Sequence, residues 1–185
     1  MSHQHFIVHK PHGYLSQFVY QKKRNKKLLG ELFPFPEGTM AIGRLDEDSE
    51  GLLLLTTDGQ LSELIRSKTV EKEYLAQVDG VISLEAIEQL KSGVSIGVKG
   101  EKYATRPCAV EAAEPFPSEG RKIRSERHGP TSWIRLVITE GKFRQIRKMT
   151  AAVGHPTLRL VRIRVGEVQL GSLKAGEVQE WYPIY

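Results

Sequence analysis

Four carboxylates stand within five positions of a chain that is otherwise basic: Asp46, Glu47, Asp48 and Glu50. Carboxylates repel phosphate groups, so a chain that only bound an anion would gain nothing from them. A catalytic carboxylate, which acts as an ionised group beside a reacting atom, explains at least one of the four. Two other interpretations remain open. The segment fits a solvated turn with a helix-capping aspartate, or a magnesium site that combines one or two carboxylates with substrate phosphates.

Basic side chains gather in two other stretches. The chain has 27 lysines and arginines against 22 acidic residues, a net charge of +5. One cluster consists of Lys22, Lys23, Arg24, Lys26 and Lys27. The other runs from Gly141 to Gly166 without an acidic residue and contains Lys142, Arg144, Arg147, Lys148, Arg159, Arg162 and Arg164. These clusters are either two solvated faces or a surface that tracks the phosphates of a nucleic acid.

Periodicity places several of these residues on particular faces. On a helix, Arg144, Arg147 and Lys148 share one face, whereas Ile146 and Met149 share another that would pack on the core. In the following strand, alternation predicts one face with Leu160, Arg162 and Arg164. A leucine on an arginine-bearing face suits the lining of a base-binding pocket. Tyr74 either lies buried in its strand or stacks on a nucleic-acid base.

The elements that position these residues follow from the same patterns. We expect strands near residues 6–8, 40–42, 52–55, 72–78, 133–139 and 158–165. We expect helices after a capping box of Thr57 and Gln60, over 83–93 and over 144–153. Residues 20–27 and 115–130 are expected to be loops. Strands and helices that do not alternate strictly predict an α+β fold.

Composition excludes several classes of protein. The 185 residues suffice for one domain with a core, and no stretch approaches the roughly 18 apolar residues of a membrane span. The polar N-terminus lacks a signal core, and the single cysteine, Cys108, fits a reducing cytoplasm. We expect the histidines at positions 3, 5, 9 and 12 to be solvated rather than bound to a metal.

Several motifs occur in an order that is more specific than any one of them: Gly43–Asp46, Ser49–Thr56, Lys72–Tyr74 and Glu140–Met149. In this combination the chain resembles the bacterial family of ribosomal RNA pseudouridine synthases. The resemblance runs from about Phe6 to the C-terminus. It implies a mixed, largely antiparallel bent sheet in two lobes, with a catalytic cleft between the lobes.

The resemblance also implies a role for individual residues. The family's catalytic aspartate falls on Asp46, and its base-stacking tyrosine on Tyr74. The arginine that pairs with the aspartate falls on Arg147, which would favour the ionised carboxylate. The cleft-lining leucine falls on Leu160, and the arginine that enters the RNA stack on Arg44. RNA-binding residues are expected to be Lys10, Lys22, Lys23, Arg24, Lys26, Lys27, Arg144, Lys148, Arg162 and Arg164.

The resemblance has departures as well. Glu47 stands where the family often has a basic residue. Many relatives begin with a separate small RNA-binding domain, but here the Lys-Pro strand starts at residue 6. We therefore expect residues 1–185 to form a single catalytic domain of two lobes. Target recognition would then rest on the catalytic domain and on the loops 20–27 and 115–130.

The activity implied is the isomerisation of a uridine in ribosomal RNA, namely the 23S RNA of the large subunit, to pseudouridine. This reaction exchanges no electrons or phosphates, so we expect no cofactor and no metal. We expect a monomer in the cytoplasm without a membrane partner. Two alternatives remain: a catalytically silent RNA-binding protein of the same fold, and a carboxylate-dependent hydrolase in which Glu50 faces Asp46.

Overall fold

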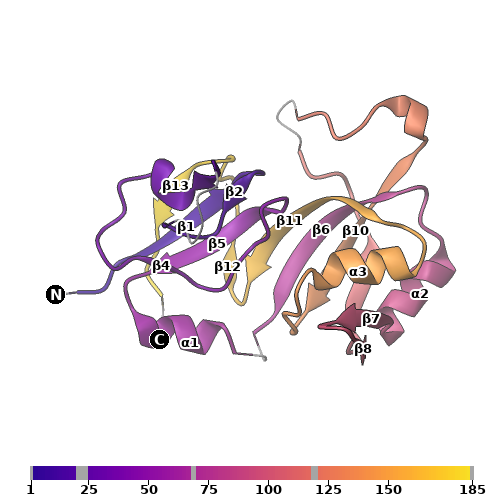
Figure 1. Ribbon diagram of the computed structural model, residues 1–185, viewed down its shortest axis with the longest axis horizontal. Coiled ribbons are helices and arrows are strands. Elements are labelled where there is room, and N and C mark those ends of the chain that lie inside the picture. Colours follow the sequence, from indigo (N-terminus) through magenta and orange to yellow (C-terminus); the bar gives the residue numbers. More distant parts are fainter. Residues whose placement is uncertain (1, 20–24, 68–69, 118–120, 184–185) are drawn as a thin grey trace. The chain divides into compact units, whose positions relative to one another are not determined.

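The computed structural model describes residues 2–19, 25–67, 70–117 and 121–183 (Figure 1). The chain divides into two compact units, which we call the first unit (Met1–Val70 with Arg162–Tyr185) and the second unit (Glu71–Val161). Each combines helices with mainly antiparallel strands, so the expected α+β class with a largely antiparallel sheet is confirmed. In the described ranges, no helix is both long enough and apolar enough to cross a membrane.

Strand β5 (Glu50–Thr56) lies at the centre of the first unit. It pairs antiparallel with β1 (His5–Lys10), where Val8 stands opposite Leu53. The outer side of β1 pairs with β13 (Val178–Glu180), and β4 (Met40–Ala41) pairs with the end of β5. Every residue of β5 is buried. The apolar run therefore forms a strand covered on both faces, as its composition predicts.

Shorter elements complete the first unit: β2 (Tyr14–Leu15), β3 (Lys27–Leu28), the 3₁₀ helix η1 (Leu29–Glu31), helix α1 (Gly59–Ile65) and β12 (Val168–Gln169). The cap of α1 differs from the expected capping box at Thr57. The Asp58 side chain accepts the N–H groups of Gln60 and Leu61 at 2.9 and 3.3 Å. Thr57 instead exchanges hydrogen bonds with the main chain of Gln4.

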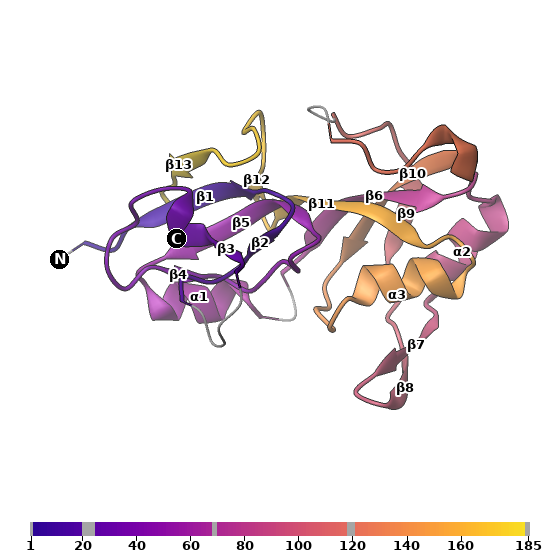
Figure 2. The ribbon, with the colours of Figure 1, turned by 45° about the horizontal axis from the view of Figure 1, so that its top comes forward.

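The sheet of the second unit consists of β6 (Lys72–Asp79), β10 (Thr131–Ile138) and β9 (Ala109–Ala112), paired antiparallel in that order. Alternate residues of β10 enter the core, where they meet helices α2 (Leu84–Ser92) and α3 (Gln145–Ala152). Figures 1 and 2 both draw the two helices alongside these strands. The segment between β9 and β10 contains a 3₁₀ helix, η2 (Glu126–His128).

Local sequence signals account for both helices. The Ser83 side chain accepts the N–H group of Ala86 at 3.1 Å, and Gly93 ends α2 with a φ of +94°. In α3, Ile146 and Met149 are buried, 3% and 0% exposed. The predicted apolar face of α3 is therefore confirmed.

A hairpin of β7 (Ser95–Val98) and β8 (Glu101–Ala104) was not predicted. Its two turn residues, Lys99 and Gly100, have φ values of +51° and +85°. Positive φ at both positions matches a type I′ turn, for which Asn-Gly and Asp-Gly are the usual signals. Lys-Gly carries a weaker signal, because lysine rarely adopts this conformation.

Strand β11 (Thr157–Val165) passes from the second unit into the first, with the boundary after Val161. Inside the first unit, its main chain comes very close to β5 at Gly51. A Cβ atom on Gly51 would lie 2.2 Å from the carbonyl oxygen of Arg162, and the φ of Gly51 is +102°. Only glycine fits this position, because other residues would meet both a clash and an unfavourable backbone conformation.

Two of the histidines differ from expectation. His5 and His9 are buried, and the Nδ1 atom of His5 lies 2.8 Å from the Thr56 hydroxyl. The Nδ1 atom of His9 lies 2.7 Å from the carbonyl oxygen of Leu173. Both point from β1 into the first unit, because β1 is covered on both of its faces.

Candidate active site

Asp46 lies half-buried in a tight loop of the first unit between β4 and β5. The carbonyl oxygen of Asp46 accepts the N–H group of Ser49 at 3.0 Å. The Ser16 hydroxyl donates to the carbonyl oxygen of Leu45 at 2.7 Å and accepts the N–H group of Leu45 at 3.0 Å. Gly13 donates its N–H group to the carbonyl oxygen of Glu47 at 2.7 Å. The main chain on both sides of Asp46 is therefore fixed.

Lys10 is completely buried and also holds this loop. Its ammonium donates to the carbonyl oxygens of Pro11, Tyr14 and Glu47 at 2.9, 2.7 and 3.4 Å. Burial lowers the pKa of Lys10 to about 8, although the carboxylates of the loop, led by Glu50, partly oppose this change. The expectation that Lys10 contacts RNA is wrong, because its ammonium is enclosed by protein.

The other residues expected at the site are divided between the two units. Arg44 is exposed on the loop of Asp46. Tyr74 lies in β6 of the second unit, where it is partly buried and packs against the core. Arg147 lies on α3 of the same unit, is half-buried, and donates to the carbonyl oxygen of Thr157 at 3.4 Å. The pairing of Arg147 with Asp46 stays a prediction.

Leu160 is 6% exposed and belongs to the core of the second unit. In that core it is grouped with Ile146 and Met149 of α3, and Tyr74 packs against the same cluster. Leu160 and Tyr74 are thus joined by one apolar cluster, which would also support a base held against them. The contact with a base stays a prediction.

The expected phosphate-binding residues differ in exposure. Arg162 is 5% exposed, and its Nε donates to the carbonyl oxygen of Leu52 at 2.8 Å, so the expectation that it binds RNA is wrong. Lys26 forms an ion pair with Glu47 at 2.6 Å, and Lys27 lies over the ring of Tyr14. Arg144, Lys148 and Arg164 are partly exposed. Lys22, Lys23 and Arg24 lie outside the described residues.

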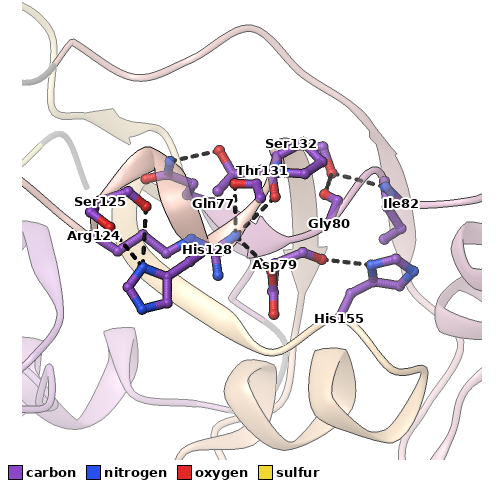
Figure 3. A network of polar contacts seen from close by, with 12 residues as sticks. Gln77, Asp79, Gly80, Ile82, Arg124, Ser125, His128, Thr131, Ser132 and His155 are labelled. Atoms are coloured by element: carbon purple, nitrogen blue, oxygen red, sulfur yellow. Dashed lines mark hydrogen bonds and ion pairs between the residues drawn. The ribbon is translucent and has the colours of Figure 1, made fainter.

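The loop between β9 and β10 is anchored to the end of β6 by Arg124 (Figure 3). The Nη2 atom of Arg124 donates to Asp79 Oδ1 at 2.7 Å and to the carbonyl oxygens of Gly129 and Pro130 at 3.2 and 2.9 Å. The hydrogen bond from Arg124 holds the pKa of Asp79 below its ordinary value. His155 contacts the carbonyl oxygen of Asp79 from the other side, at 2.7 Å.

Arg159 also secures this loop and was not among the expected site residues. Its buried guanidinium lies 5.3 Å from the ring centre of Phe116 and 5.8 Å from that of Trp133. It donates to the carbonyl oxygens of Phe116 and Pro117. A hollow of about 740 Å³ lies beside it, under the loop. The only sequence signal was a basic residue on the strand face opposite Leu160.

The candidate reacting group of the site is the carboxylate of Asp46, on a loop whose main chain is fixed. Across residues 2–19, 25–67, 70–117 and 121–183, no group of three or more histidine, cysteine, aspartate or glutamate side chains is gathered to hold a metal ion. Ser16 was missed by sequence reasoning as well, because a lone serine 29 residues away carries no signal for the contact with Leu45. An aspartate on a braced loop can act as a nucleophile or as a base.

Comparison with known proteins relates the whole chain to one family. A family model described as RNA pseudouridylate synthase matches residues 4–152. Ribosomal large subunit pseudouridine synthase E of Xanthomonas axonopodis pv. citri (strain 306) is 41% identical over 172 residues, covering 90% of this chain and 88% of the relative. Ribosomal large subunit pseudouridine synthase B of Bacillus subtilis (strain 168) is 31% identical, and the match covers 97% of this chain and 68% of the relative.

A solved structure agrees with these relatives. The crystal structure of a pseudouridylate synthase superposes with a TM-score of 0.77 at 28% identity, covering 98% of this chain and 71% of that one. The resemblance carried by the Gly43–Asp46 motif and its companions is therefore confirmed.

Proposed function

The chain belongs to the RNA pseudouridylate synthase family and is an RNA uridine isomerase, and we propose that it acts on large-subunit ribosomal RNA through Asp46. Relatives whose names refer to the large ribosomal subunit share 39–41% identity with most of the chain, which supports 23S RNA as the substrate. One observation carries the choice of Asp46. It ends the Gly43–Asp46 motif on a loop whose main chain Lys10 and Ser16 fix.

The reaction changes the atom through which uracil is attached to the ribose. The bond between the sugar C1′ and N1 of uracil breaks, the base turns, and C1′ joins C5 instead. A proton leaves C5, and N1 gains a proton, so atoms and electrons balance without a cofactor. An ionised carboxylate assists, either as a nucleophile or by steering the separated base and sugar. In this proposal Asp46 supplies that carboxylate.

The other site residues hold the extruded uridine. A target base in a structured RNA must leave its stack, which costs a few kcal/mol. We assign the exposed Arg44 to the gap that the extruded base leaves in the RNA stack. Tyr74 is assigned to stack on the face of the uracil, and Leu160 to support it from the apolar cluster that they share. Arg147 is assigned to Asp46, where a nearby cation would favour the ionised carboxylate.

The proposal extends to the whole chain. Both units would form a single catalytic domain, and the enzyme would act as a monomer in the cytoplasm, where ribosomes assemble. The described side chains that remain candidates for phosphate contacts are Lys26, Lys27, Arg144, Lys148 and Arg164. Lys22, Lys23 and Arg24 complete this basic set. The loop from Pro115 to Pro130, held by Arg124 and Arg159, would contribute to target recognition.

The assignment of Asp46 is tested with RNA that carries tritium at C5 of uridine, because isomerisation releases this hydrogen to water. Asp46→Asn should abolish release while the RNA affinity and melting temperature stay close to wild type. Asp48→Asn, a neighbouring carboxylate of the same loop, is the matched control and should keep turnover. Normal release by Asp46→Asn would contradict the assignment. Tight RNA binding by a wild type that releases no tritium would instead favour a silent binding protein.

The substrate is tested separately. Pseudouridine should be missing from one position of 23S RNA in cells that lack this protein, and the purified enzyme should restore it. An unchanged 23S map with a lost position in another RNA would overturn the choice of substrate while leaving the isomerase activity intact.

A further inference from the structure

Phe143 is 69% exposed in the connection between β10 and α3 of the second unit. An aromatic ring on a basic surface can stack on a nucleic-acid base, because every base has a π face. We propose that Phe143 is a stacking platform for an RNA base outside the catalytic pocket. This inference rests on the proposed function, since it names a second contact with the same RNA.

The loop that carries Phe143 is fixed by the side chain of Gln145. The Oε1 atom of Gln145 accepts the N–H group of Lys142 at 3.1 Å, and the N–H group of Gln145 donates to the carbonyl oxygen of Lys142 at 3.1 Å. Gln145 itself is 4% exposed. Main chain and side chain of one buried residue therefore close a short turn around Phe143, and the ring is held outside it.

Glu140 in turn holds Gln145. The carboxylate of Glu140 accepts the Gln145 amide at 2.7 Å, the N–H group of Arg106 at 3.0 Å and the hydroxyl of Tyr103. Burial alone would raise the pKa of Glu140, but these hydrogen bonds keep it below its ordinary value. The turn is thus tied to β8 and to the chain that follows it. A base that stacked on Phe143 would need little ordering of the protein.

Arg144 connects Phe143 to the start of α3 with an unusual backbone conformation. Its φ is +52° and its ψ is 36°, a left-handed conformation that is unfavourable for a residue other than glycine. This single residue reverses the chain so that α3 begins at once, with the N–H group of Lys148 donating to the carbonyl oxygen of Arg144 at 3.1 Å. The strain persists at the residue that follows the exposed ring.

One cation, the ammonium of Lys148, lies beside the ring of Phe143. The ammonium of Lys148 lies 5.4 Å from the centre of the Phe143 ring and donates to the carbonyl oxygen of Gly97 at 2.6 Å. The ammonium of Lys142 lies 4.6 Å from the ring centre of Tyr103. An aromatic face next to positive charge suits a nucleotide, whose base stacks while its phosphate meets the ammonium.

The basic stretch that contains Phe143 favours RNA over an apolar protein partner. No acidic residue occurs from Gly141 to Gly166, whereas a hydrophobic docking surface has a mixed, polar rim. Leu84 shows the contrast within the same unit. It is 77% exposed at the start of α2, and Glu85 and Glu88 follow it. Leu84 therefore serves as the matched control, with similar exposure but acidic neighbours.

The experiment measures RNA affinity at two salt concentrations, with melting temperature and tritium release alongside. Phe143→Ala should weaken binding about 5- to 150-fold, the range for the loss of one stacked base. The slope of log affinity against log salt should not change, because no phosphate contact is lost. Release at saturating RNA should match wild type. Leu84→Ala should leave all of these quantities unchanged.

Two further variants separate stacking by an aromatic ring from contact by any large apolar side chain. Phe143→Trp should keep the affinity of wild type and add fluorescence quenching on RNA binding, whereas Phe143→Leu should bind as weakly as Phe143→Ala. Wild-type affinity of either Phe143→Ala or Phe143→Leu would overturn the inference. Loss of tritium release by wild type would overturn the proposed function instead. RNA that fails to bind even wild type would overturn both.

Discussion

Lys10 brings a positive charge to the main chain of the loop that carries Asp46. Its ammonium is completely buried, yet it is satisfied by the carbonyl oxygens of Pro11, Tyr14 and Glu47. A buried ammonium without such partners would be strongly unfavourable. By holding three carbonyl oxygens of two separate segments, Lys10 fixes the main chain of the loop that carries Asp46.

The lowered pKa of Lys10 predicts a change of stability with pH. Below about pH 8 both the folded and the unfolded chain carry the proton, and the folded state bears the full cost of the buried charge. Between about pH 8 and the ordinary lysine value of 10.5, only the unfolded chain binds it, so stability rises with pH. Lys10→Met lacks this rise. From pH 7 to pH 10, wild type should gain about 2 kcal/mol relative to Lys10→Met.

Urea unfolding of both proteins at several pH values measures this difference. Each alkaline group other than Lys10 is common to the two proteins and cancels in the comparison. Parallel curves of unfolding free energy between pH 7 and pH 10 would show that the ammonium keeps its proton in the folded state, contrary to this prediction.

Sequence alone singled out Asp46 as the candidate carboxylate, but it did not predict what surrounds it. The Gly43–Asp46 motif is local, so the residue types and their spacing were sufficient. Besides the nearby carbonyl oxygens of Pro11 and Tyr14, the ammonium of Lys10 is held by that of Glu47, which is 37 residues away. Arg162 was misjudged for the same reason, since its partner Leu52 is 110 residues away. Distant main-chain acceptors leave no pattern in the sequence.

At the scale of elements, the close approach of β5 and β11 sets the end of the loop that carries Asp46. Gly51 follows Glu50 directly, and its main chain lies against that of Arg162. The Nε atom of Arg162 then donates to the carbonyl oxygen of Leu52 at 2.8 Å. One glycine and one buried arginine therefore join the two strands where the loop of Asp46 returns to the sheet.

Gly51→Ala should lower the unfolding free energy by about 3 kcal/mol or more. Its Cβ would lie 2.2 Å from the carbonyl oxygen of Arg162 at a φ of +102°, so strain and clash add. Gly59→Ala is the control, because no atom within 4 Å would meet a Cβ there and the residue lies in α1. This variant should be neutral or more stable by up to about 1 kcal/mol. Chemical denaturation measures the unfolding free energies of Gly51→Ala and Gly59→Ala. Equal values for the two variants would contradict the predicted clash and strain at Gly51.

The elements that sequence predicted best have strong and local signals. The apolar run Leu52–Leu55, the Ser83 cap with Gly93, and the amphipathic spacing of α3 all led to the correct structure. The hairpin of β7 and β8 and the short strand β13 were missed. Short strands are stabilised by the neighbours with which they pair, so their own sequence carries little preference.

At the scale of the whole molecule, the basic residues act together rather than one at a time. Burial removes Lys10 and Arg162 from the phosphate-binding set, and Lys26 already has Glu47 as a partner. Both units still contribute cations: Lys27 and Arg164 belong to the first, and Arg144 and Lys148 to the second. An RNA that contacts both units would therefore sum their electrostatic contributions.

This sum predicts a steep salt dependence of RNA binding. If about five to seven of the remaining basic side chains meet phosphates, log affinity should fall with log salt at a slope of roughly −3.5 to −5, at about −0.7 per contact for single-stranded segments. Lys27→Ala should lower affinity for target and non-target RNA alike and reduce the slope by at most about one unit. Lys91→Ala is the control, since Lys91 pairs with Glu88 on α2 and its loss should leave the slope unchanged.

Arg147→Ala should instead lower turnover more than RNA affinity, because its proposed partner is Asp46. A slope near zero for wild type would contradict the prediction that several basic side chains contact phosphates. An Arg147→Ala variant with weak binding but full single-turnover rate at saturation would assign Arg147 to phosphate binding rather than to Asp46.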